Sequence, residues 1–439
     1  MLIRSAVLFL FLIPVAACQK QASFFDARQM HYQVKMEMDP AGQFLRVDGS
    51  LYIPGLDDGL TEMTFYLHRQ LKINELKGPG IIGFTVDSLT PTGYAWLPDA
   101  KMVHVQLDRK GSTGKALELF FSYEGHLTKW AAYSANAFTA EWVELGLYFP
   151  WYLHSIDLRS FTYQIEVQCP DNYRISGLHE VAPADEGWLL SAEVPVNDMV
   201  ILASPSLRSF SEDSGGLRVI FDYVSLSDTL VGRMTADIQE IADWMVGQFG
   251  PVPFKSVHIV QSPRAAGGGY ARVGGVVLGG LQESNYHLYH TGYQRYFAHE
   301  IAHLWWRHAP TSNWHDWINE AFAEYSALML LREVFGRELY QRYVDTKRSK
   351  LKGTPPMWEF DRHDRSDPGR GDLIELMLYS KGPVLLADLE AKAGIRAFLS
   401  LCRHLLLFDT IDTGQLLTSI SAVLSDSLSE QFRQTLMTF

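Results

Sequence analysis

The sequence predicts an α+β fold in which an antiparallel β domain precedes a mainly helical domain. Segments between residues 28 and 224 alternate polar and apolar side chains, as half-buried strands do, and turns rich in Gly, Pro, Asp and Asn divide them. From Asp228 to Phe249 the hydrophobic period becomes helical. We place the domain boundary at this change, so that residues 28–224 form the β domain and residues 225–439 the helical domain.

The amino-terminal segment has the layout of a lipoprotein leader. A short positive start and an apolar stretch at residues 6–15 precede the small-residue site Val15-Ala-Ala-Cys18. This stretch is short for a bilayer core of about 30 Å, and the whole arrangement resembles a bacterial lipobox. The resemblance implies a signal peptide at residues 1–17, lipid on Cys18 and a tether at residues 18–27. We therefore expect a protein of the bacterial cell envelope, anchored to a membrane by lipid on the periplasmic or outer-membrane side.

Composition limits the classes of partner. The formal net charge of −12 argues against nucleic acid, because phosphate binding needs a basic surface. With 47% hydrophobic residues in a chain of 439, more than one core can be buried. Of the three cysteines, Cys169 and Cys402 lie in different predicted domains, so we do not expect them to pair.

The strands of the β domain are predicted in order from their alternation. The alternating segments are residues 32–38, 45–53, 103–107, 117–123, 161–167 and 217–223. Glu141 and Glu144 lie in another segment of this domain, at residues 139–145. They are candidates to reach a substrate cleft from the β domain, although such residues are more often solvated strand positions.

The helical domain contains the pentapeptide His299-Glu-Ile-Ala-His303. Apolar residues recur around it at three- and four-residue intervals, which predicts a helix with both imidazoles on one face. Two such histidines can bind one Zn²⁺, and Glu300 between them can take a proton from water at the metal. The competing interpretation is two buried histidines that carbonyl groups satisfy, so a third ligand is needed.

A second predicted helix, which begins near Trp317, contains another motif. The segment Trp317-Ile-Asn-Glu-Ala-Phe-Ala323 resembles the Trp-x-Asn-Glu-Gly-Phe-Ala segment of the gluzincin aminopeptidases, the aminopeptidase N family. The resemblance implies that Glu320 is a zinc ligand, with one zinc ion per chain. Sixteen residues lie between His303 and Glu320, where the family has eighteen, so we expect a shorter loop. Two imidazoles and one carboxylate leave a fourth position open for water, as catalytic zinc requires.

Two more residues are expected to support this site. Glu324 lies one helical turn after Glu320, where it could accept the free ring N–H of a ligating histidine. A plain surface carboxylate is the other interpretation of Glu324. The segment Tyr379-Ser-Lys-Gly382 is similar to the family's Tyr-x-Lys-Gly helix. That similarity implies that Tyr379 donates to the oxyanion of the reaction, although a lone tyrosine in an apolar helix is more often a core residue.

The resemblance also implies the architecture and shows one departure. The family has a saddle-like β domain followed by a thermolysin-like domain, and we expect both here. Its Gly-x-Met-Glu-Asn strand corresponds to residues Gly268, Gly269, Tyr270, Ala271 and Arg272, all candidates for the substrate cleft. Ala271 stands where the family has the glutamate that pairs with a peptide's free amine. Arg272 beside it would repel an ammonium group and favour an acidic one.

The sequence therefore predicts a zinc metallopeptidase that hydrolyses peptide bonds of a peptide or protein substrate, without strict dependence on a free amino terminus. An extended peptide could pair with the edge strand at residues 268–272. Two alternatives remain open. One is an aminopeptidase with a different amine anchor, and the other is a zinc-containing lipoprotein that binds or scaffolds without catalysis.

Overall fold

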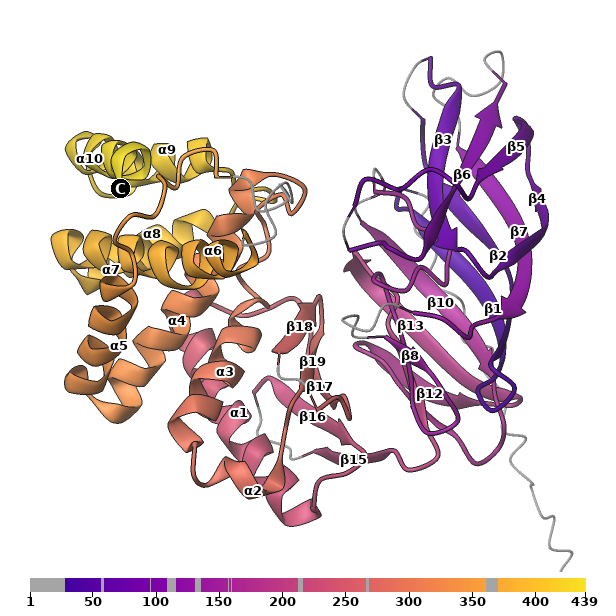
Figure 1. The fold of residues 1–439 in the computed structure, drawn as a ribbon, viewed down its shortest axis with the longest axis horizontal. Coiled ribbons are helices and arrows are strands. Elements are labelled where there is room, and N and C mark those ends of the chain that lie inside the picture. The colour runs from indigo at the N-terminus through magenta and orange to yellow at the C-terminus, as the bar shows by residue number, and fades with distance from the viewer. Residues whose placement is uncertain are drawn as a thin grey trace, which may run out of the picture.

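The computed structural model describes residues 28–56, 59–94, 96–108, 116–130, 136–156, 158, 160–211, 216–265, 268–360 and 370–439. The expected leader, Cys18 and the tether lie outside the described residues. In the described part, the β-rich domain precedes a mainly helical domain, which confirms the predicted α+β class (Figure 1). No helix in these ranges combines the length and the apolar character that crossing a bilayer requires.

A seven-stranded sheet forms the body of the N-terminal domain, in the order β12-β13-β10-β1-β2-β7-β4. Side chains alternate in burial along β1, where Val34 and Met36 are buried and Lys35 is exposed, as a half-buried strand requires. The pairs are antiparallel as predicted, except that β1 and β10 are parallel. The strands are β1 (His31–Asp39), β2 (Phe44–Ile53), β4 (Lys72–Lys77), β7 (Leu117–His126), β10 (Phe161–Gln168), β12 (Glu180–Ala184) and β13 (Gly187–Val196).

Two smaller antiparallel sheets complete this domain. One has the order β3-β6-β5 and the other the order β11-β14-β9-β8. Their strands are β3 (Glu62–His68), β5 (Ile81–Asp87), β6 (Ala100–Leu107), β8 (Ala137–Phe138), β9 (Val143–Leu145), β11 (Arg174–Ser176) and β14 (Ile201–Ser204).

A five-stranded sheet, in the order β15-β16-β17-β19-β18, lies between the helices and the β-rich domain (Figure 1). Its strands are β15 (Arg208–Ser211), β16 (Arg218–Tyr223), β17 (Ser256–Gln261), β18 (Gly268–Arg272) and β19 (Gly275–Gly279). The predicted boundary after residue 224 puts residues 208–223 in the β domain. However, β16 pairs in parallel with β17, because α1 carries the chain back across the sheet, so β15 and β16 share a sheet with the C-terminal part.

The helices pack into the second domain around one apolar core. Helix α4 is buried over almost all of residues 317–331, which explains its apolar character on every face. The helices are α1 (Asp228–Phe249), α2 (Glu283–Tyr286), α3 (His290–Ala302), α4 (Trp317–Phe335), α5 (Arg337–Ser349), α6 (Arg370–Leu376), α7 (Gly382–Ala393), α8 (Ile395–Leu405), α9 (Thr413–Val423) and α10 (Asp426–Thr438). A short 3₁₀ turn, η1 (Trp314–Asp316), precedes α4, and a π-helical turn, η2 (Met377–Lys381), precedes α7.

Candidate metal centre

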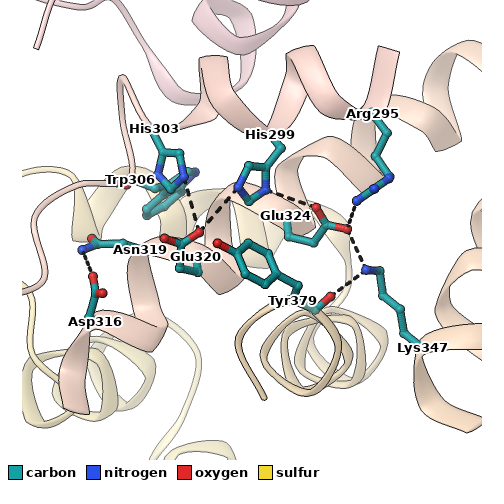
Figure 2. Close-up of polar contacts among 10 residues, drawn as sticks. All are labelled: Arg295, His299, His303, Trp306, Asp316, Asn319, Glu320, Glu324, Lys347 and Tyr379. Atoms are coloured by element: carbon teal, nitrogen blue, oxygen red, sulfur yellow. Dashed lines mark hydrogen bonds and ion pairs between the residues drawn. The ribbon is translucent and has the colours of Figure 1, made fainter. Parts of the chain in front are cut away.

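The two histidines of the pentapeptide lie at the end of α3 and face Glu320 in the first turn of α4 (Figure 2). Nε2 of His299 and Nε2 of His303 are each 3.5 Å from Oε2 of Glu320. In the described ranges these residues form the one cluster whose ligand atoms could hold a metal ion, all within 4.8 Å of one another. A tetrahedral ion with bonds of about 2.0–2.1 Å spaces its ligand atoms about 3.3–3.4 Å apart, so the donor set fits zinc.

The electrostatics of the cluster also suit a cation. Burial lowers the pKa of His299, but its hydrogen bonds to Glu320 and Glu324 outweigh this effect and raise that pKa to about 10. Burial likewise opposes protonation of His303, yet the nearby Glu320 raises its pKa. The carboxylates that favour a proton on each imidazole also favour a divalent cation between them.

Buried acceptors hold both imidazoles in orientation. Nδ1 of His299 is 3.1 Å from Oε2 of Glu324, and Nδ1 of His303 is 3.0 Å from the carbonyl oxygen of Trp306. Glu324 is 1% exposed and its other oxygen, Oε1, accepts from Arg295 at 2.6 Å and from Lys347 at 2.7 Å. Arg295 and Lys347 were not among the predicted site residues. Arg295 had a signal, because it lies one helical turn before His299, but Lys347 had none.

The short loop between the ligand helices is held by Asn319. Its Nδ2 donates to the carbonyl of Ala309 and to Oδ1 of Asp316, and its Oδ1 accepts from the N–H of Ala309. Asn319 is 5% exposed, so these bonds are shielded from water. The residue before Glu320 therefore ties the incoming loop to α4 and holds the first turn of that helix in place.

Glu300 lies between the histidines and is 7% exposed, and burial raises its pKa. Strand β18 passes close to it. A Cβ added at Gly269 would lie 3.1 Å from Cδ of Glu300 and 3.0 Å from the hydroxyl oxygen of Tyr296. Glycine therefore allows this close approach. Among the described strands β18 is an edge strand that pairs with β19, so a peptide added to its open edge would run near Glu300.

Tyr379 lies on the π-helical turn η2, a rare conformation that often marks functional sites. Its ring centroid is 5.5 Å from that of His299, and its hydroxyl points toward Glu320 (Figure 2). The turn can approach α4 because residue 382 is glycine: a Cβ there would lie 2.5 Å from Cβ of Ala321, the neighbour of Glu320. The structure thus brings Tyr379 to the same side as the three candidate ligands.

Glu144 lies between the two domains rather than in a cleft. It is 0% exposed and accepts from Nε1 of Trp142 at 2.9 Å, from Oγ of Ser262 at 2.6 Å and from the hydroxyl of Tyr270 at 3.2 Å. The expectation that Glu144 could reach the substrate is therefore wrong, because these bonds and its burial occupy it. Glu141, by contrast, is exposed on the segment between β8 and β9.

Arg272 also joins the domains. Its Nε is 2.8 Å from Oδ2 of Asp198, and its guanidinium lies over the rings of Tyr148 and Tyr270 at 5.0 and 4.9 Å. Successive side chains of a strand point to opposite faces, so the face of β18 that carries Tyr270 and Arg272 is turned away from Glu300. The expectation that Arg272 attracts an acidic substrate group is therefore wrong.

The remaining candidates of this strand lie near the helices. Ala271 shares its face with Gly269 and packs against the core of the helical domain. Gly268 is exposed at the start of the strand with φ of +98°, a conformation that favours glycine. No carboxylate of β18 therefore faces the metal-ligand cluster, since the strand contains none.

No family model matches the chain. A probable aminopeptidase 1 from Sulfurisphaera tokodaii is 25% identical over 161 aligned residues, and the match covers 34% of this chain. The match spans only 20% of that relative's length.

Solved structures resemble the chain over nearly its whole length. An M1 zinc metallopeptidase from Deinococcus radiodurans has a TM-score of 0.69 at 17% identity, covering 93% of this chain and 94% of that one. A mutant of it bound to a Tyr-Ser-Ala substrate has a TM-score of 0.67 at 16% identity, with coverages of 94% and 95%. The chain therefore has the two-domain fold of these metallopeptidases, as the sequence resemblance implied.

Proposed function

We propose that this chain, which has the fold of an M1 zinc metallopeptidase, is a zinc-dependent peptidase with one zinc ion per chain. His299, His303 and Glu320 would hold the ion, and their convergence on one point is the observation that carries the proposal. When bound, zinc would polarise the scissile carbonyl and lower the pKa of water. The likeness to a metallopeptidase that binds a Tyr-Ser-Ala substrate supports a peptide as the substrate.

The protein's own residues then have separate tasks. Glu300 accepts the proton of the attacking water on its carboxylate and delivers it to the leaving nitrogen. The hydroxyl of Tyr379 donates to the oxygen on which negative charge develops. Glu324 holds the ring of His299, and the carbonyl of Trp306 holds that of His303, so that each Nε2 would be free to bind the ion.

The substrate is an extended peptide that pairs with the open edge of β18. Because residue 271 is alanine and Arg272 is bound to Asp198, this strand offers no carboxylate to a free amino terminus. We therefore propose cleavage that does not strictly depend on that terminus. The alternative is an aminopeptidase with another anchor, and the exposed Glu141 is the remaining candidate for it.

Matched peptides with free and acetylated amino termini test this proposal. Mass spectrometry of the products should show internal cuts and similar turnover for both peptides. Stepwise loss of single residues from the free peptide alone would support the aminopeptidase. A protein that holds one zinc ion and cleaves neither peptide would be the binding or scaffold protein.

We also propose a location at the bacterial cell envelope, with the chain anchored to a membrane by lipid on Cys18. The support is the order of a positive start, an apolar stretch and a small-residue cleavage site before that cysteine. The anchor would hold the peptidase on the periplasmic or outer-membrane side, next to extracytoplasmic peptides.

A further inference from the structure

Lys347, on α5, contacts both the residue that supports the candidate ligand His299 and the backbone of Tyr379. Its ammonium is 2.7 Å from Oε1 of Glu324 and 2.6 Å from the carbonyl oxygen of Tyr379 (Figure 2). Its side chain is 12% exposed, so both contacts are shielded from solvent. The ammonium of Lys347 therefore contacts both the carboxylate of Glu324, which orients His299, and the backbone carbonyl of Tyr379.

Pro383 removes one backbone donor that could otherwise reach this carbonyl. In an α-helix, the carbonyl of Tyr379 would accept from the N–H of residue 383. That residue is Pro383, which has no N–H to donate. The chain forms the π-helical turn η2 here, and the ammonium of Lys347 supplies a donor to the carbonyl of Tyr379.

We propose that Lys347 is a positioning residue that sets where Tyr379 stands relative to the zinc ligands, an inference that rests on the proposed peptidase function. Glu324 is held by His299 on one oxygen and by Lys347 on the other, and Lys347 in turn holds the backbone of Tyr379. This chain of contacts links α4 to η2 through α5. Without it, the hydroxyl of Tyr379 loses its place beside the reacting carbonyl, while the three ligands remain.

Arg295 offers a matched comparison within the same cluster. Its guanidinium donates to the same Oε1 of Glu324, at 2.6 Å, as Lys347 does at 2.7 Å. The interactions of Arg295 do not include the carbonyl of Tyr379 that Lys347 holds. Removing either cation therefore weakens the support of His299, but only removal of Lys347 also removes the hydrogen bond from its ammonium to the carbonyl of Tyr379.

The first experiment compares kinetics of Lys347→Met, Arg295→Met and Tyr379→Phe with the two double variants that contain Tyr379→Phe. We expect Lys347→Met to lower kcat about 10- to 100-fold, beyond the effect of Arg295→Met, with KM and zinc content like those of Arg295→Met. In the Tyr379→Phe background, the two methionine substitutions should have equal effects. An unchanged excess for Lys347→Met in that background would overturn the proposal.

The second experiment needs no activity and no zinc. Crystal structures of the zinc-free variants should show the ring of Tyr379 displaced from its 5.5 Å separation from His299 in Lys347→Met and retained in Arg295→Met. A tyrosine that keeps its place in Lys347→Met would refute the positioning role even if the wild type cleaved no peptide. If Lys347→Met does not fold, Lys347→Gln, which keeps a polar side chain but removes the positive charge, replaces it in both experiments.

Discussion

The variant Glu324→Gln tests most directly whether the buried carboxylate of Glu324 supports the candidate metal site. The carboxylate is 1% exposed and accepts hydrogen bonds from His299, Arg295 and Lys347. Burial alone would raise its pKa, but these partners hold that pKa far below the ordinary value for glutamate. Glutamine keeps the shape and removes the negative charge, so two cations then lie beside a neutral amide.

The structure sets the size of two separate effects. Removing one partner of a buried ion pair costs about 3–5 kcal/mol of folding stability, and we expect the lower end because 34% of the Arg295 side chain is exposed. The ring of His299 also loses a charged acceptor. Loss of such an orienting partner lowers metal affinity about 10- to 100-fold.

Glu390→Gln is the matched control. Glu390 is 8% exposed, binds Arg332 through both oxygens and accepts from Tyr325, and it lies outside the metal-ligand cluster. Urea unfolding of the zinc-free proteins should show both variants destabilised. Competition for zinc with a chelator should show weaker binding in Glu324→Gln alone. Wild-type zinc affinity in Glu324→Gln would refute the orienting role, and equal losses of affinity in both variants would mean that the effect is general destabilisation.

Four further predictions concern separate parts of the molecule. Glu300→Gln should keep zinc and lose hydrolysis, since an amide cannot accept the proton of water; metal analysis beside peptide turnover checks this, and surviving turnover would contradict it. Glu320→Ala should lose metal, because two imidazoles alone hold zinc weakly, and a fully metallated variant would place the third ligand elsewhere. Burial lowers the pKa values of His154 and His258 from 6.5 to about 4. The unfolded chain therefore binds these protons first as pH falls. The contribution of each imidazole to folding stability is therefore fully present above pH 6.5 and is lost toward pH 4, by about 3 kcal/mol per imidazole. Urea unfolding midpoints at several pH values would measure this loss, and the variant His258→Gln should show a shallower dependence of stability on pH. The Cys18→Ser protein should be released from the membrane fraction and keep its peptidase activity. Retention of this variant in the membrane fraction under high salt would argue against a lipid anchor.

The prediction of the candidate site depended on short sequence motifs and on the spacing of residues along a helix. Residues four apart share a face of a helix, so His299 and His303 were expected together, as was Glu324 one turn after Glu320. The structure brings these residues together, with Tyr379 beside them. The Tyr-x-Lys-Gly resemblance pointed to Tyr379, and the close approach of Gly382 to Ala321 gives the physical reason for its glycine.

The sequence by itself therefore determined the class of fold and the residues that lie within one or two helical turns of each other, because helix and strand periods are local properties of the chain. Tertiary structure decided the pairings between distant segments that no motif marks: β16 with β17, Arg272 with Asp198, and Lys347 with both Glu324 and Tyr379. Such contacts depend on how whole elements pack. The partner of a charged side chain can be identified only from the folded structure. Burial makes an unpaired charge costly, so a buried charge lies next to a group that pairs with it.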